Sequence, residues 1–482
     1  MLTEKKLYRI IDRLNLIINR LLSWGWYDSS IAYAKCLANL YYIFGVKYVD
    51  MVLERYVKTL SDKIILSQDN NKDEYACVFY DDFSVDNRGL TQQYIESLLA
   101  LGYKITYIYP SKSKDNKRII TALSHSHNQI VPIEHNHNGM QLAQQIYDIV
   151  NSSCAKHLFL HMLPYSVEAS IALCALDSTI KKYNINLTDH AYNIGTTHMD
   201  YNIEFRNYGA NISVKYRGIE EEKEILLPMF PILDTSFPYE GYPKACDNKV
   251  VILTGGAIYK VIDDSEIFFK LIKEVLSTNL NAVVVYIGCR DMALFDKYLS
   301  KYGLKDRMLV LGERKDIYRL MMSCDIYMNT FPIGGGLMCQ IAASLGKPVI
   351  NYKHNQGIEE CICQRQHVEM SFDTVNEFCD EMTKLVEDEQ YRLRRGQEFK
   401  ASMVNAAHFR KLLGEFLKNG KGGVPIDLFK TYEKESILDM QSAIIRENQN
   451  MMFHKFMCKT LGHKVIAFPN ILKRVLKSQI QW

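Results

Sequence analysis

The feature that most constrains the fold is an alternation between short apolar runs and longer segments with helical spacing, which fills residues 249–351. Short apolar runs bounded by turn residues predict buried strands, and the segments between them are long enough for helices. Strands joined by helical crossovers run parallel. We therefore predict a parallel sheet with strands at Lys249–Leu253, Ala282–Ile287, Met308–Leu311, Ile326–Met328 and Pro348–Asn351, and helices at Ile262–Leu276, Ala293–Lys301, Asp316–Ser323 and Leu337–Leu345.

The same alternation occurs earlier in the chain and predicts a second parallel sheet. Its strands are predicted at Ala76–Tyr80, Lys104–Tyr109, Gln129–Ile133, His157–His161 and Asn186–Thr188, with a helix at Leu90–Leu101. Residues 234–247 are rich in Pro, Gly and Tyr, which is typical of a linker between domains. Two tandem Rossmann-like domains joined by a linker predict a cleft between them. Ligands of such sheets bind outside the carboxyl ends of the strands, so we expect the ligand in this cleft.

The two ends of the chain are predicted to be helical. Residues 1–70 carry an apolar face, which either binds a partner protein or packs on the next domain, and packing is the commoner use of such a face. The basic tail, residues 426–482, has no acidic residue after Glu447. It either contacts an anionic membrane surface or packs on the protein. The predicted domains are 1–70, 71–235, 236–425 and 426–482.

Composition limits the possible functions and locations. Lys and Arg total 58 and Asp and Glu total 55, and this net charge of +3 gives no support for nucleic-acid binding. No apolar run is long enough to span a bilayer, and the first residues lack the apolar core of a signal peptide. The 12 cysteines include no CxxC pair. We expect a cytoplasmic protein, with peripheral membrane contact through the tail left open.

Glycine-rich turns follow two strands of the second domain. Gly255 and Gly256 come directly after its first strand, with Lys260 close behind, and Gly334–Gly336 precede the helix that starts near Leu337. Exposed amides, a helix N-terminus and a lysine suit a phosphate group. The Lys-Ser/Thr of a Walker loop is absent, so an NTPase is not supported. The two turns favour a diphosphate ligand.

These residues resemble the donor-binding half of GT-B glycosyltransferases. The second domain is most similar to the group of protein O-GlcNAc transferases and bacterial cytosolic N-glucosyltransferases, in its Tyr-Lys at 259–260, its Asp-to-Gly-rich segment 325–336 and its Gly-x-Pro-Val strand at 346–349. The resemblance implies an α/β fold of the GT-B type and a nucleotide-sugar donor, with uridine as the base. It implies that the donor is bound by Gly255, Gly256, Lys260, Gly312, Arg314, Asn329, Thr330, Gly334, Gly335, Gly336 and Leu337.

The sequence departs from the retaining members of this fold. Ile333 and Ile341 stand where many retaining enzymes carry two glutamates, so the resemblance implies an inverting transfer that needs no metal. Ile341 also cannot bind the ribose, for which Gln340 or Glu359 remain as candidates. The group's His-Thr-Thr is Gly336-Leu337-Met338 here. A histidine-rich patch around residues 125–137 is flanked by Ser and Asn, as in loops, so we predict no metal site.

The first domain is expected to hold the acceptor and a general base. Asp189 and His190 follow a predicted strand, and a histidine beside a carboxylate at a strand end suits proton abstraction. Lesser candidates on the acceptor side are Asn87, Arg88, Gly89, His161 and Asp200.

We therefore expect a hexosyltransferase that moves a sugar from a UDP-sugar to a protein or glycan acceptor, without a cofactor. Two alternatives remain open from the sequence. One is a catalytically inactive GT-B subunit that acts as a partner or chaperone of an active enzyme, and the other is a nucleotide-sugar epimerase.

Overall fold

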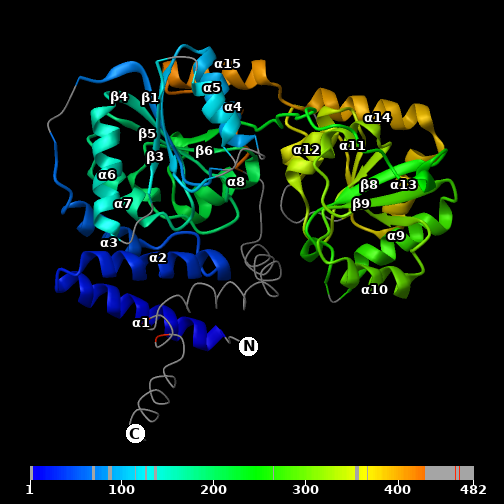
Figure 1. The fold of residues 1–482 in the computed structure, drawn as a ribbon, viewed down its shortest axis with the longest axis horizontal. Coiled ribbons are helices and arrows are strands. Elements are labelled where there is room, and N and C mark those ends of the chain that lie inside the picture. The colour runs from blue at the N-terminus through cyan, green and yellow to red at the C-terminus, as the bar shows by residue number, and fades with distance from the viewer. Residues whose placement is uncertain are drawn as a thin grey trace, which may run out of the picture.

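The computed structural model describes residues 4–428, except 68–70, 85–88, 114–115, 125–126, 135–137, 264, 353–357 and 366, together with residues 462 and 466. Figure 1 shows two α/β domains side by side, each built around its own sheet, with the N-terminal helices beneath the first. The predicted α/β fold with two tandem sheets is confirmed. Asn87, Arg88, most of the histidine patch and nearly all of the basic tail lie outside the described residues.

The first sheet is parallel throughout and has the strand order β3-β2-β1-β4-β5-β6-β7. Its central strands are apolar and buried because helices cover both faces. The strands are β1 (Asp73–Asp81), β2 (Lys104–Pro110), β3 (Gln129–Ile133), β4 (Ala155–His161), β5 (Lys181–Ile185), β6 (Tyr201–Glu204) and β7 (Glu224–Leu226). The helices are α4 (Leu90–Ala100), α5 (Lys117–Leu123), α6 (Gly139–Ser152), α7 (Val167–Ala175) and α8 (Asn207–Ile212).

One predicted strand of this sheet is wrong. Asn186–Thr188 was expected to be a strand, but β5 ends at Ile185. The side chain of Asn186 is buried and bonded to Glu204 and Asn193 across the loop, so these polar residues form a turn at the strand's carboxyl end.

The N-terminal helices belong to the first domain. They are α1 (Glu4–Ser23), α2 (Tyr27–Phe44) and α3 (Met51–Ser61). The apolar face of α1 packs on α2, and α2 and α3 pack on α6 and α7, so that one hydrophobic core runs through all of them. The predicted packing of these helices on the next domain is confirmed.

The second sheet is also parallel, with the order β10-β9-β8-β11-β12-β13. Its strands are β8 (Val250–Gly255), β9 (Ala282–Ile287), β10 (Met308–Val310), β11 (Ile326–Met328), β12 (Val349–Tyr352) and β13 (Ser371–Phe372). Its helices are α9 (Ile267–Thr278), α10 (Met292–Tyr302), α11 (Ile317–Ser323), α12 (Gly336–Ser344), α13 (Val375–Glu387) and α14 (Glu389–Ser402).

The chain then returns to the first domain. Helix α15 (Ala406–Asn419) lies beside α4 at the top of that domain in Figure 1. Its buried Phe409, Leu413 and Phe416 join the core of the first sheet. Residues 406–424 therefore pack on the first domain, although the sequence placed them in the second. No helix among the described residues has the length and apolar character needed to cross a membrane.

Candidate functional site

A cavity of about 640 Å³ lies between the two domains, at the carboxyl-terminal edges of both sheets. Its volume is typical of small-molecule sites. The first domain lines it with Tyr42, Leu90, Leu187, Asp189, His190, Phe205, Arg206 and Met229, and the second with Lys260, Ile333, Gly334, Gly335, Gly336, Leu337, Met338 and Cys361. The cavity therefore brings Asp189 and His190 together with Lys260 and the Gly334–Gly336 turn, which lie far apart in the sequence.

On the second-domain side, two turns are tied to each other. The side-chain oxygen of Asn329 accepts hydrogen bonds from the backbone amides of Thr330 and Gly335, at 2.9 and 2.8 Å. The amide of Ile333 donates to the carbonyl of Lys260 at 3.2 Å. These bonds direct the N-terminus of α12 and the Lys260 side chain toward the same space. An anion in this space would meet a positive helix end and an ammonium group.

Gly255 and Gly256 shape this side of the cavity without lining it. A Cβ on Gly255 would lie 2.4 Å from the carbonyl oxygen of Ile287, so only glycine allows β8 to approach β9 this closely. A Cβ on Gly256 would lie 3.1 Å from the Lys260 side chain. Gly256 thus leaves room for the lysine to extend along the turn.

Gly312 and Arg314, which were also predicted to bind the donor, make a different set of contacts. Arg314 forms a bidentate ion pair with Asp316, at 2.8 and 2.6 Å, and also donates to the carbonyl of Gly241 in the linker. The carbonyl of Gly312 accepts from Gly288. Neither Gly312 nor Arg314 lines the cavity. Arg314 anchors the linker to the start of α11, and its contact with the donor stays a prediction.

Of the departures noted in the sequence, Ile333 and residues 336–338 line the cavity, whereas Ile341 lies in the interior of the second domain. Ile341 is fully buried on α12, and the amide of Gln340 donates to the carbonyls of Met229 and Cys361, so this glutamine is committed to holding the two domains together. Thr330, also predicted at the site, is buried and donates to the carbonyl of Ile333 at 2.6 Å. Among the described residues, no cluster of His, Cys, Asp and Glu could hold a metal ion.

On the first-domain side, Asp189 orients His190. Asp189 is buried and binds the Arg206 guanidinium through both oxygens, and one of these oxygens lies 3.2 Å from Nδ1 of His190. Burial would raise the pKa of Asp189, but the charge of Arg206 and the hydrogen bonds hold it well below its ordinary value. A charged carboxylate only accepts, so Nδ1 of His190 carries the proton toward it. Nε2 of the neutral ring is then free to accept a proton.

Two arginines that were not predicted from the sequence support this arrangement. Arg206 is the buried partner of Asp189, and Arg217 donates to the carbonyls of Asp189 and Ala191, each at 2.7 Å. Tyr42 from α2 was also missed, although it lines the cavity. Single residues without a motif carry no sequence signal, and only the folded loop brings them to the site.

The other acceptor-side candidates do not converge on the cavity. His161 is buried and bonded to Asp81 and Thr91, at 2.9 and 3.1 Å. Gly89 is the left-handed cap of α4 and packs against Ile232. Asp200 was expected near the acceptor, but it precedes β6 and binds the Lys182 amide at the amino-terminal edge of the sheet. That edge is opposite to the cavity, so this placement is wrong.

Comparisons with known proteins give a family match for the second domain and structural matches for most of the chain. Residues 248–388 match the family described as glycosyl transferases group 1. A comparison with curated protein sequences finds no match.

Solved structures match over most of the chain at low identity. A mutant of the O-GlcNAc transferase of Thermobaculum terrenum is 13% identical, with a TM-score of 0.52 over 91% of this chain and 85% of that one. HepE of Anabaena, solved in complex with UDP and glucose, is 14% identical, with a TM-score of 0.52 over 71% and 99%. A structure described as a UDP-N-acetylglucosamine 2-epimerase from Listeria monocytogenes is 8% identical, with a TM-score of 0.52 over 73% of this chain and 100% of that one.

The likeness to the first of these structures extends over 91% of the chain, and the family match falls on the domain that carries Lys260 and the glycine-rich turns. The chain therefore has the GT-B glycosyltransferase fold and resembles the O-GlcNAc transferase group, with a second domain that matches glycosyl transferases group 1.

Proposed function

We propose that the chain is a glycosyltransferase that moves a hexose from a UDP-sugar to a protein or glycan acceptor. One observation carries this proposal. A single cavity holds an anion-binding surface, made of Lys260 and the N-terminus of α12, and a histidine oriented by a buried carboxylate on its other wall. A donor diphosphate and an acceptor hydroxyl would meet between them.

Lys260 and the backbone amides at the N-terminus of α12, which begins at Gly336, would hold the donor diphosphate, while the Gly335 amide is bonded to Asn329. Negative charge grows on the diphosphate as the bond to the sugar breaks, and fixed positive groups stabilise that transition state more than the ground state. The choice of uridine draws on the resemblance to the O-GlcNAc transferase group and on HepE, whose structure is described as a complex with UDP and glucose. The positive charge of these groups would serve in place of a metal ion.

His190 would act on the acceptor. Nε2 takes the hydroxyl proton while the acceptor oxygen forms a bond to the anomeric carbon, and the bond from that carbon to the diphosphate oxygen breaks on the opposite face. The anomeric configuration is inverted in this single displacement. Ile333 and Ile341 stand where retaining enzymes carry glutamates, which supports inversion.

The decisive test is thermal stability with UDP-, GDP-, CMP- and dTDP-sugars, beside UDP alone. A ligand at a hundred times its dissociation constant adds about 2.7 kcal/mol to the native state, which is a readable shift. We expect a shift with UDP-sugars that is lost in Lys260→Ala and kept in the control Lys273→Ala, a lysine on the exposed face of α9. No shift with any nucleotide sugar would contradict the donor site and favour an inactive subunit.

An epimerase is the second candidate, and the Listeria neighbour described as a UDP-N-acetylglucosamine 2-epimerase favours it. An epimerase needs no acceptor, so it would convert the sugar of UDP-N-acetylglucosamine alone. Proton NMR of that mixture separates the two functions. A transferase leaves the sugar configuration unchanged until an acceptor is added.

A further inference from the structure

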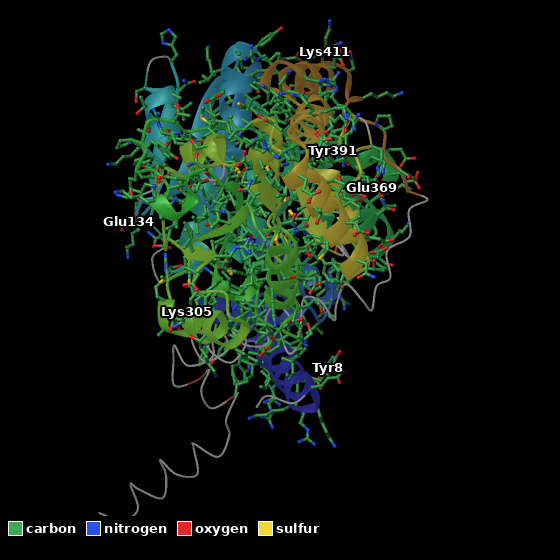
Figure 2. The ribbon with its side chains drawn as sticks, turned by 90° about the vertical axis from the view of Figure 1, so that its right-hand side faces the viewer. Tyr8, Glu134, Lys305, Glu369, Tyr391 and Lys411 are labelled. Carbon is green, nitrogen blue, oxygen red and sulfur yellow. The ribbon has the colours of Figure 1, made fainter. Side chains whose placement is uncertain are left out.

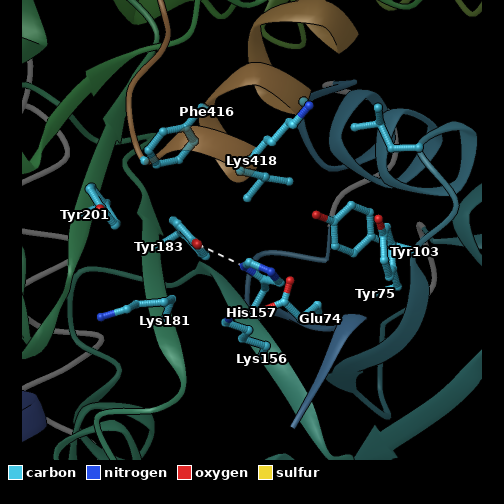
Figure 3. A pocket seen from close by; sticks show the side chains of 14 residues that line it. Glu74, Tyr75, Tyr103, Lys156, His157, Lys181, Tyr183, Tyr201, Phe416 and Lys418 are labelled. Atoms are coloured by element: carbon cyan, nitrogen blue, oxygen red, sulfur yellow. Dashed lines mark hydrogen bonds and ion pairs between the residues drawn. The ribbon is translucent and has the colours of Figure 1, made fainter.

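A second cavity, of about 550 Å³, opens at the other end of the first sheet (Figure 3). It lies where β1, β4, β5 and β6 begin, and α15 covers one side of it. The carboxyl-terminal edge of the same sheet faces the cavity between the domains. Among the described residues, no side chain lines both cavities. The second cavity is therefore a separate feature that the proposed transfer does not use.

Aromatic rings form much of its wall. His157, Tyr183 and Tyr201 stack across the starts of neighbouring strands, with ring centroids 5.7 and 5.6 Å apart. Phe416 of α15 meets the edges of both tyrosines, at 5.5 and 5.1 Å. In Figure 3, Tyr103 and Tyr75 stand on the side facing this group. Tyr75 is 62% exposed, so its ring is open to a ligand.

The charges around this cavity are mostly positive. Lys156, Lys181 and Lys418 line it, with Glu74 as the acidic member. Glu74 pairs with Lys156, and Asp200 lies 3.4 Å from Lys181, so these two lysines are partly neutralised. Lys418 makes no ion pair with any described residue. Burial lowers the pKa of His157 to about 4, so its ring is neutral near pH 7. A positive charge is therefore left beside the aromatic wall.

We infer that this cavity binds a saccharide that carries an acidic group, such as a uronic acid or a sugar phosphate. The CH face of a pyranose packs on an aromatic ring, tyrosine hydroxyls offer hydrogen bonds to sugar hydroxyls, and Lys418 pairs with the carboxylate or phosphate. The volume suits a mono- or disaccharide. A nucleobase, which needs a flat stacking surface, fits less well. Both faces of Tyr183 are covered by its neighbours, and the rings of Tyr75 and Tyr103 are tilted by 47° to each other.

The site is tested by saturation-transfer NMR with methyl β-glucuronide as the probe. We expect transfer to the probe with the full chain, and at least about fivefold weaker affinity in Lys418→Ala and in Tyr75→Ala, since each removes a charge-assisted bond or a ring contact. Both residues lie at the surface, so both variants should fold. The matched control is Lys411→Ala on the same helix, whose side chain is 73% exposed and lies at the outer surface in Figure 2.

Further competition and mutation experiments distinguish this site from the donor site and from nonspecific anion binding. Lys260→Ala should leave the glucuronide signal unchanged, and UDP should not compete with it. Glucose 6-phosphate should compete, whereas inorganic phosphate should not compete at the same concentration. The proposal is overturned if the probe shows no transfer, if both variants keep full affinity, if UDP or inorganic phosphate displaces the probe, or if Lys260→Ala abolishes the signal. Loss of donor binding alone would overturn the proposed transfer and leave this site standing.

Discussion

At the scale of single residues, His190 is the group whose chemistry is most sharply defined. Its ring is 37% exposed toward the cavity, and Asp189 fixes its orientation. We expect His190→Gln to lower the rate of UDP release in the presence of acceptor by about 10²–10⁴-fold, the range for a lost general base. Donor binding should be unchanged, because Lys260 and α12 are intact. The control is His367→Gln at an exposed position, and a His190→Gln enzyme with full turnover would exclude the proposed base.

A buried carboxyl pair behind this site makes stability depend on pH. Glu204 and Glu224 share the side-chain amide of Asn202. Burial raises the pKa of Glu204 to about 7 against the attraction of Arg217, and burial together with Glu204 raises the pKa of Glu224 well above its ordinary value. Above pH 4.5, the native protein therefore holds more protons than the unfolded chain does. The stability that these protonated groups contribute is present at low pH and is lost as the pH rises through 7.

We therefore expect the melting temperature to fall by a few °C between pH 6 and 8.5, measured by scanning fluorimetry in buffers of equal ionic strength. Glu224→Gln resembles the protonated form and should flatten this slope, whereas the exposed Glu220→Gln should not change it. A steeper fall in Glu224→Gln would contradict the assigned protonation.

The sequence identified those site residues that carry a local signal. Lys260 and the glycines were found because they follow strands in a recognisable pattern, and Asp189 and His190 were found because they follow β5 even though that strand was misplaced. Asp200 was assigned to the wrong edge because β6, which it precedes, was not predicted. Arg206 and Arg217 act through partners that the fold brings close, so no local pattern could have identified them.

At the scale of elements, the turn before α12 can be tested with two glycines of different roles. A Cβ on Gly335 would meet its nearest neighbour, Nζ of Lys260, at 3.6 Å, which is an ordinary contact, whereas one on Gly255 would clash with β9. We expect Gly335→Ala to fold normally and to bind UDP about tenfold more weakly, because the methyl group occupies the anion-binding surface.

Gly255→Ala should instead lower the melting temperature, since β8 and β9 must move apart. Thermal scans with and without UDP distinguish the two effects. Equal loss of stability in both variants would show that Gly335 serves the fold and not the ligand.

The elements that the sequence predicted are those with continuous apolar runs, such as β3, β9 and β11, whose observed bounds are the predicted ones. Strands β6 and β7 were missed because they carry Asn202, Glu204 and Glu224, polar side chains whose hydrogen bonds are satisfied inside the fold. Helix α15 was missed as a part of the first domain, because its apolar face does not specify which sheet it will cover.

At the scale of the whole molecule, the cleft could be predicted from two tandem sheets and a linker. The contacts that hold the two domains together could not be predicted from the sequence. Gln340 and Gln364 both donate to the carbonyl of Met229, and Tyr208 donates its amide to Glu360. Such bonds join polar residues far apart in the chain and depend on how the two domains dock.

These contacts enclose Cys361, which reports whether the domains separate. Cys361 is 3% exposed at the cavity, and burial raises the pKa of its thiol to about 11 against the nearby Arg206. Alkylation therefore requires opening of the cleft. We expect Gln364→Ala, which removes the interdomain hydrogen bond to Met229 together with the bonds to Cys361 and Val404, to speed the labelling of Cys361 by about two- to tenfold, and UDP to slow it in both proteins. Peptide mass spectrometry after iodoacetamide treatment measures this rate, with the fully buried Cys339 as the internal control and Gln390→Ala as the surface control. If Cys361 and Cys339 were labelled together, global unfolding rather than domain opening would expose them, and the cleft would be rigid on this timescale.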